Sequence, residues 1–301
     1  MIRFTKIPAA LLLTAMLGIV PASAQHVINI PHPEAGWENT INSAPAYSVI
    51  TLGPGQYHTS VPIKVSAPGI TIAGAGARAT QIIADARMEW LIESTSRTVS
   101  LRDLVVNANH MAATAVDMDD STYPDIEVLN GVFASFAIND GIVLHRCQIC
   151  MISGVSSYKN GGNGVVFSGC NACTAIGISA HENGGVGILI QPNSDTGEQF
   201  SGGMTLIGAN AEANKRAQIH VQNTTTAVLI ENPWIEGHAE ATDGILIEAP
   251  HVSVLGGRIS GPGGRGTSAI HCVGAGKDAN VAGNVQLAGD VAGSTYGRVD
   301  K

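Results

Sequence analysis

The chain has 301 residues and a formal net charge of −8, from 16 basic and 24 acidic residues. This balance argues against binding to nucleic acid or to an anionic membrane surface, and it would repel an acidic polymer unless a local basic patch or a bound cation intervened. Charged residues make up 13%, aromatic residues 4%, and glycine numbers 36. Short Val- and Ile-rich runs separated by Gly, Asn or Ser therefore predict an all-β protein with frequent turns.

The first 24 residues have the features of a secretory signal peptide. Arg3 and Lys6 give a positive start, and residues 9–20 form an apolar run too short to span a bilayer. Residues 22–24, Ala-Ser-Ala, form a small-x-small cleavage site. We therefore expect an exported protein that begins at Gln25, has no membrane span, and resides in the periplasm or outside the cell. Without those two basic residues its charge would be −10, from 14 basic and 24 acidic residues.

A repeat is visible from the middle of the chain onward. Similar segments begin at Gly131, Gly154, Gly177, Gly208, Asn232 and Gly257, at steps of 23, 23, 31, 24 and 25 residues. β-branched residues recur at one place in each repeat: Val116, Ile142, Val165, Ile188, Ile219, Ile245 and Ile270. This pattern predicts stacked coils of short parallel strands, in which neighbouring coils bury a continuous core. The regular Leu and the Asn of leucine-rich repeats are missing.

The upstream segment agrees with this prediction. Residues 50–83, ITLGPGQYHTSVPIKVSAPGITIAGAGARATQII, resemble the first coils of the pectate-lyase-like superfamily, and residues 36–49, GWENTINSAPAYSV, resemble its N-terminal cap. The resemblance implies a single-stranded right-handed parallel β-helix over residues 25–290, with coils of about 23 residues and a short cap. Residues 291–301 would form a flexible tail. The superfamily includes lyases, hydrolases, esterases, epimerases, phage depolymerases and inert surface proteins, so it implies a fold and not one activity.

Four cysteines form two C-x2-C pairs, Cys147/Cys150 and Cys170/Cys173. Such pairs can hold zinc. Here, however, the spacing from one pair to the next is 23 residues, which equals one coil. Stacked strands and an oxidising compartment would permit disulfides from Cys147 to Cys170 and from Cys150 to Cys173. Stacked thiols, pairing within each C-x2-C, and a zinc site remain alternatives, and Cys272 is expected to be a buried apolar residue.

Alignment of the coils also predicts a column of outward-facing side chains, because residues alternate between the two faces of a strand. The catalytic residues predicted in it are His181, Glu212 and Glu236, since carboxylates and imidazoles transfer protons. Two carboxylates about 5–5.5 Å apart would suit a retaining glycosidase and a wider pair an inverting one. The residues predicted to bind sugar are Tyr158, Asn210, Trp234 and His238. The alternative interpretation is a solvated polar face, in which Asn160, Asn183 and Asn214 form an asparagine ladder.

An acidic turn offers a second candidate site. Asp117, Asp119 and Asp120 lie in AVDMDDSTYPD and could bind Ca²⁺ through oxygen ligands. The resemblance to pectate lyases implies such a cation together with a basic residue that removes a proton, but no basic residue aligns with these acids. A solvated loop is the other interpretation. We therefore expect no required cofactor, with Ca²⁺ as the candidate metal.

Together these features predict an exported carbohydrate-active protein. It would cleave or modify a polysaccharide by acid–base chemistry, as a lyase or a glycoside hydrolase, on one outer face of the β-helix. The alternative is a cell-surface or matrix protein that binds glycans without catalysis. We expect a polysaccharide partner, no nucleic acid, and a monomer rather than a homotrimer.

Overall fold

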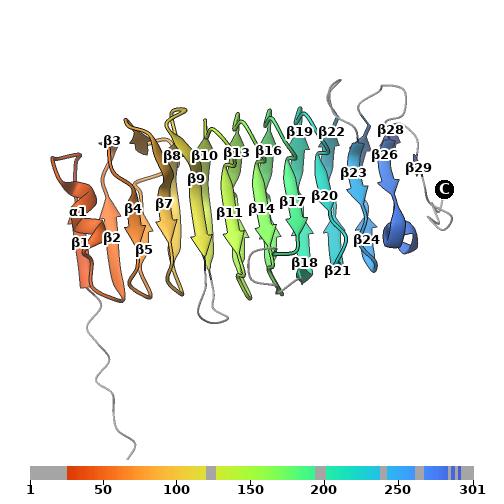
Figure 1. Cartoon of the computed structure of the whole chain (residues 1–301), viewed down its shortest axis with the longest axis horizontal. Coiled ribbons are helices and arrows are strands. Elements are labelled where there is room, and N and C mark those ends of the chain that lie inside the picture. Colours follow the sequence, from red (N-terminus) through yellow and green to blue (C-terminus); the bar gives the residue numbers. More distant parts are fainter. Residues whose placement is uncertain are drawn as a thin grey trace, which may run out of the picture.

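The structure is a computed structural model that describes residues 26–119, 127–193, 201–237, 243–261, 268–283, 286–288 and 291–292. The predicted signal peptide therefore lies outside the described residues. The described part is all-β and forms a parallel β-helix of about 10 turns, stacked along one axis into a rod (Figure 1). The predicted fold is thus confirmed.

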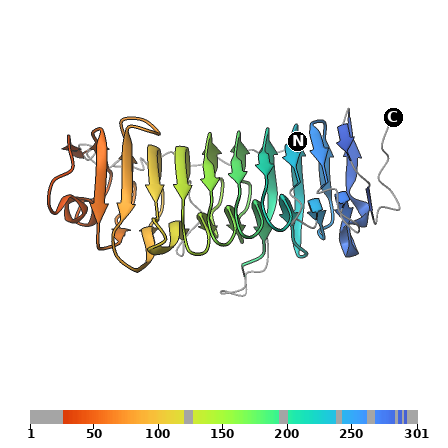
Figure 2. The same ribbon diagram turned by 90° about the horizontal axis from the view of Figure 1, so that it is seen from above.

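Each coil contributes strands to flat parallel sheets that run the length of the rod (Figure 2). One sheet, sheet B, has ten strands within the described residues: β4 (Ile63–Val65), β7 (Met88–Ser94), β9 (Ala112–Asp119), β11 (Ile142–His145), β14 (Val165–Ser168), β17 (Ile188–Gln191), β20 (Ile219–Val221), β23 (Asp243–Ile247), β26 (Ser268–Cys272) and β29 (Val291–Ala292).

The other sheet, sheet A, folds into two walls. Wall A1 contains β1 (His26–Ile30), β2 (Ser48–Leu52), β5 (Thr71–Ala73), β12 (Met151–Ser153), β15 (Thr174–Ile176), β18 (Ser201–Ile207), β21 (Thr225–Glu231), β24 (Val252–Leu255) and β27 (Asn280–Ala282). Wall A2 contains β3 (Gly55–Thr59), β6 (Thr80–Ala84), β13 (Ser156–Tyr158), β16 (Ser179–His181), β19 (Asn210–Glu212), β22 (Trp234–Glu236), β25 (Arg258–Ser260) and β28 (Gln286–Ala288). Two longer strands run through both walls: β8 (Ser100–Asn107) and β10 (Val128–Ser135).

The predicted apolar ladder is the spine of sheet B. Its seven members pair in register from coil to coil, and all of them are fully buried. Inward side chains alternate with outward ones along each strand, so every coil presents its apolar residues to the same core. This stacking buries apolar surface that a single coil would leave exposed to water.

The corner from wall A1 to wall A2 requires a left-handed backbone. Gly131, Gly154, Gly177 and Gly208 occupy it in successive coils, with φ between 58° and 62°. Glycine adopts this conformation without the steric cost that a Cβ brings. The starting residue of the predicted repeats at Gly131, Gly154, Gly177, Gly208 and Asn232 is therefore the residue that turns the corner. The last predicted start, Gly257, was wrong by one residue, because strand register places Gly256 at this corner.

The segment that resembles a cap does cover the N-terminal end. Helix α1 (Trp37–Asn42) follows β1, and Trp37 and Ile41 are buried against the first coils. The indole N–H of Trp37 donates a hydrogen bond to His58 O at 3.1 Å, and its ring meets that of Tyr57 edge to face at 5.1 Å. The short 3₁₀ helix η1 (Gly274–Asp278) lies near the other end of the rod. Strand β29 continues the β-helix two residues into the predicted tail.

The asparagine ladder lies in the turns that lead from wall A2 to sheet B. Asn160 Nδ2 donates to Asn183 Oδ1 at 2.9 Å, and Asn183 Nδ2 donates to Asn214 Oδ1 at 2.8 Å. Each side chain also accepts a backbone N–H from the coil before it. Gln218 ends the row, accepting from Asn214 Nδ2 at 2.8 Å. The ladder therefore satisfies polar groups in turns that are buried from water.

The two C-x2-C segments lie one above the other on neighbouring coils, as their 23-residue spacing predicted. A disulfide joins Cys150 to Cys173, whose Cα atoms are 4.5 Å apart. Cys147 and Cys170 are buried without a disulfide between them, and Cys170 Sγ lies 3.2 Å from Leu144 O. Cys272 is also buried, and burial raises the pKa of its thiol to about 11. Within the described residues, no group of three or more His, Cys, Asp or Glu side chains could hold a metal ion.

Among the residues that the structure describes, no helix is long and apolar enough to cross a membrane.

Candidate functional site

The predicted column is present on the outer face of wall A2. Strand register places Tyr158 beside His181, His181 beside Glu212, and Glu212 beside Glu236. His181 Nδ1 lies 2.9 Å from Glu212 Oε1, and the Ser179 hydroxyl contacts the other ring nitrogen of His181. The coil alignment therefore brought these residues together correctly, and their catalytic role remains a prediction.

A second outward row of wall A2 lies two residues before the column on each strand. Asn210 pairs in register with Trp234, and Trp234 with Arg258. The guanidinium carbon of Arg258 lies 4.9 Å from the centre of the Trp234 ring, and its Nη1 lies 3.5 Å from Glu236 Oε1. Arg258 therefore packs on the ring that was expected to stack on sugar, although Trp234 stays 46% exposed. His238 lies outside the described residues.

A cavity of about 300 Å³ opens instead on the outer face of sheet B. It is lined by side chains from the ends of three neighbouring strands, β7, β9 and β11, and by one residue that follows β17. The lining residues are Trp90, Glu93, Thr95, Asp117, Asp119, His145, Arg146 and Asn193. Such a mixture of aromatic, acidic and basic groups in a concave site is typical of ligand-binding and catalytic sites.

His145 and Asp117 form the buried pair of this cavity. His145 Nε2 lies 3.5 Å from Asp117 Oδ2, and Asp117 is only 8% exposed. Burial lowers the pKa of His145, but the hydrogen bond to Asp117 and the negative charges of Asp117 and Asp119 outweigh it, so the pKa is raised. Asp119, which is more exposed than Asp117, accepts a hydrogen bond from Arg146 Nε at 3.1 Å.

Asp140 lies close enough to this pair to interact with it electrostatically. Burial raises the pKa of the Asp140 carboxyl, although the backbone N–H of Asn163 donates to it at 2.6 Å and the charge of His145 lowers the pKa. The cavity thus holds an imidazole paired with a carboxylate, and Asp140, whose carboxyl pKa is raised, interacts with that pair from outside the cavity lining. Groups whose environments shift their pKa values in this way can donate and accept protons near neutral pH.

The predicted calcium ligands fall at this cavity. Asp117 and Asp119 face the cationic partners His145 and Arg146 rather than each other, and Asp120 lies outside the described residues. A Ca²⁺ ion prefers six to eight oxygen ligands. Two carboxylates that already pair with His145 and Arg146 supply too few oxygen ligands for such a site. Calcium binding remains a prediction.

His145, Arg146 and Asp140 were missed by the sequence analysis. The predicted outward-facing column lies in wall A2, whereas these three residues lie in or beside sheet B strand β11. The ladder residues Val116 and Ile142 carry the missing signal: Asp117 follows the first directly, and His145 comes three residues after the second. Both are outward positions on adjacent strands, and register places His145 opposite Asp119 and Asp117 opposite Val143. An alignment continued into sheet B would therefore have brought these acidic residues and His145 to one face.

No family model matches this chain, and the comparison with curated proteins gives no match. Solved structures do resemble it. The alginate lyase from Paenibacillus sp. matches with a TM-score of 0.56 at 15% identity, over 89% of this chain and 98% of the lyase. The A-module of a mannuronan C-5 epimerase from Azotobacter vinelandii matches with a TM-score of 0.52 at 16% identity, over 87% of this chain and 94% of the module.

A viral protein, ORF18 of Geobacillus virus E2, matches with a TM-score of 0.56 at 12% identity over 86% of this chain, which spans 58% of the viral chain. At these identities the likeness concerns the fold alone. It confirms the right-handed parallel β-helix that the resemblance of the sequence implied.

Proposed function

We propose that this protein acts on a polysaccharide by acid–base chemistry, and that the reaction takes place in the sheet B cavity. The observation that carries the proposal is the pair of the partly buried His145 and the buried Asp117, in a cavity that Trp90 also lines. Structural neighbours whose names describe them as acting on alginate or mannuronan support a carbohydrate ligand. The sequence of residues 1–24 supports action after export.

The roles follow from the protonation states. With its pKa raised, His145 can hold a proton at neutral pH and give it to a leaving oxygen, while Asp117 orients the ring and stabilises the cation. Glu93, Asp117 and Asp119 are the carboxylates that line the same cavity. A lyase would use such groups to remove a proton from a sugar carbon while the bond to the leaving oxygen breaks and that oxygen is protonated. An epimerase would remove the proton and return one to the other face of the same carbon, and a hydrolase would use the groups to activate water and protonate the leaving oxygen.

The test compares two sets of variants on residues 25–301. The cavity variants are D117N and H145Q, and the matched variants on wall A2 are H181Q and E212Q, which change the same kinds of group. A panel of uronate-containing and neutral polysaccharides is followed for new reducing ends and for the ultraviolet absorbance of unsaturated uronates, with thermal melting as the check on folding. On any polymer that is degraded, we expect the cavity variants to lose at least about a hundredfold in rate and the wall A2 variants to keep it.

Loss of activity in H181Q and E212Q alone would move the site to the predicted column and overturn our placement. No change in any polymer would favour the alternative of a non-catalytic glycan-binding protein. A gain of ultraviolet absorbance would identify a lyase, whereas reducing ends without it would identify a hydrolase.

A further inference from the structure

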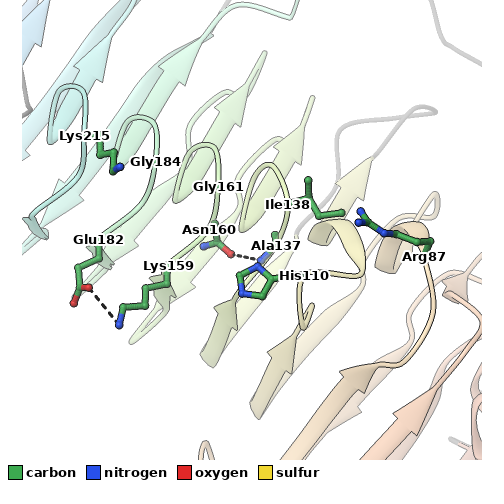
Figure 3. Close-up of a pocket in the computed structure, with 10 residues that line it drawn as sticks. All are labelled: Arg87, His110, Ala137, Ile138, Lys159, Asn160, Gly161, Glu182, Gly184 and Lys215. Atoms are coloured by element: carbon green, nitrogen blue, oxygen red, sulfur yellow. Dashed lines mark hydrogen bonds and ion pairs between the residues drawn. The ribbon is translucent and has the colours of Figure 1, made fainter.

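A second groove, of about 530 Å³, runs along the corner where wall A2 turns into sheet B. Six successive coils contribute to it, and Figure 3 shows its side chains following one another along the row of turns, from Arg87 at one end to Lys215 at the other. We call it the corner groove. Its lining residues are Arg87, His110, Ala137, Ile138, Lys159, Asn160, Gly161, Glu182, Gly184 and Lys215. At a strand spacing of about 4.8 Å, five steps extend for roughly 24 Å, which is enough for several linked sugars.

The corner groove concentrates positive charge on an acidic protein. Arg87, Lys159 and Lys215 are exposed cations on its wall, and His110 adds an exposed imidazole. Its one acidic side chain is Glu182, whose carboxylate lies 3.4 Å from Lys159 Nζ. Since the whole chain has a net charge of −8, a row of cations at one corner creates a local potential opposite to that of the surface around it.

An aromatic row borders the same groove. The ring centres of His110 and Phe136 are 5.5 Å apart, those of Phe136 and Tyr158 are 6.0 Å apart, and both pairs meet edge to face. Lys159 Nζ lies 4.8 Å from the centre of the Tyr158 ring. A sugar ring packs its C–H face on an aromatic ring, so the groove joins a surface for sugars to a surface for anions.

The backbone at this corner supports a role for these side chains. His110, Phe136, Lys159 and Glu182 all have positive φ, between 52° and 57°. At the other corner glycine occupies the left-handed position in the coils of Phe136, Lys159 and Glu182, and Asp103 occupies it in the coil of His110. At the groove corner all four coils place a residue with a Cβ there, at a cost of about 1 kcal/mol each. The same conformation continues at Ala213 in the next coil (φ 55°), so the left-handed turn is a feature of this corner, and it sets the direction in which the His110, Phe136, Lys159 and Glu182 side chains leave the backbone.

We propose that the corner groove is a binding site for an anionic glycan, with sugar rings on the row of His110, Phe136 and Tyr158 and with carboxylate or sulfate groups on the cations. The site is separate from the sheet B cavity. It rests on the proposed function in one respect only, namely that the ligand is a carbohydrate.

The test measures binding by calorimetry in the D117N chain, which keeps the groove and removes a cavity group. The probes are an oligogalacturonate, its methyl ester, and a sulfated dextran oligosaccharide of similar length. We expect the anionic probes to bind more tightly than the ester and to weaken as salt is added. A double variant of the groove, R87Q with K215Q, should weaken binding by about fivefold to tenfold. The matched control, R97Q with K277Q, removes two exposed cations elsewhere and should change binding less than about twofold.

Equal binding of the ester and the anionic probes, or equal weakening by both double variants, would overturn the inference. Binding of only one anionic probe would support it and assign the ligand to carboxylated or to sulfated glycans. The binding measurement does not depend on catalysis. Activity that persists in D117N would refute the cavity as the catalytic site and would not affect the proposal for the corner groove. Catalysis confirmed at the cavity without any binding of anionic probes would instead reject the groove alone.

Discussion

At the scale of single residues, the contact between His145 and Asp117 makes folding stability depend on pH. The pKa of His145 is raised in the folded protein above its ordinary value of 6.5, because the favourable effect of Asp117 exceeds the cost of burial. A raised pKa means that the folded state binds the proton more tightly than the unfolded state. The pair's contribution is therefore complete below pH 6.5 and is lost as the pH rises through the higher, folded value.

The D117N variant tests this dependence. It should be less stable than the wild type by about 1–3 kcal/mol at pH 6, because a buried imidazolium loses its charged partner. The difference should shrink towards alkaline pH, where His145 is neutral in both proteins. Urea unfolding at pH 6 and pH 9 measures both differences. A difference that stays constant with pH, or grows, would show that the pair does not hold a proton on His145.

Whether residues such as these can be found from sequence depends on the face they occupy. Val116 and Ile142 were predictable because inward residues are apolar in every coil, and a ladder of seven is visible by inspection. Asp117 and His145 are outward, where polar residues are ordinary, and only their pairing across two strands distinguishes them. Sequence periodicity therefore indicates the register of the coils, but it carries little information on which outer sheet face holds a cavity.

At the scale of elements, the asparagine ladder shows how the turns are held to one another. Asn183 is fully buried and links three coils: its Nδ2 donates to Ser157 O at 3.2 Å and to Asn214 Oδ1 at 2.8 Å, and its Oδ1 accepts from Asn160. Each turn therefore depends on the amide of the next. The same turns carry the corner groove, so the ladder also fixes the spacing of the groove's cations.

Replacement of Asn183 by Ala should show this dependence. The variant leaves polar groups of Asn160 and Asn214 buried without their partner, which should cost about 2–4 kcal/mol of unfolding free energy. Asn223 is an exposed asparagine in a turn, and N223A should change stability by less than about 0.5 kcal/mol. Denaturant unfolding of both variants provides the comparison. If N183A lost no more unfolding free energy than N223A, water molecules would be replacing the hydrogen bonds of the Asn183 side chain.

At the scale of the whole molecule, the coil step explains both the success and the limits of the sequence analysis. Steps of 23 to 25 residues, together with Gly at one corner, were sufficient to align the coils and to place Tyr158, His181 and Glu212 in one line. The corner groove could not be found in that way. It depends on positive φ at bulky residues such as Phe136 and on rings that meet across coils, and no repeated residue type marks either feature.

If the β-helix is a stack of equivalent coils, one coil should be removable. Residues 232–255 form a full step: Asn232 and Gly256 both have positive φ at equivalent corners. Without this segment, β19 would lie against β25, and Ile219 against Ile270. In the intact chain both members of each pair stack on the deleted coil, on β22 and on Ile245 respectively. Stability in such arrays is approximately a sum over neighbouring coils, so loss of one coil should lower the melting temperature modestly and keep unfolding cooperative.

The matched control deletes residues 232–243, about half a coil. This shorter deletion removes a wall A2 strand, so the chain would pass from wall A1 directly into sheet B and every later inward residue would lose its partner. We expect the full-coil deletion to retain a β-sheet circular dichroism spectrum and to bind the groove probes as the intact chain does, since the groove and the cavity lie in earlier coils. The half-coil deletion should unfold or aggregate. Equal stability of the two deletions would contradict a stack in which register is set coil by coil.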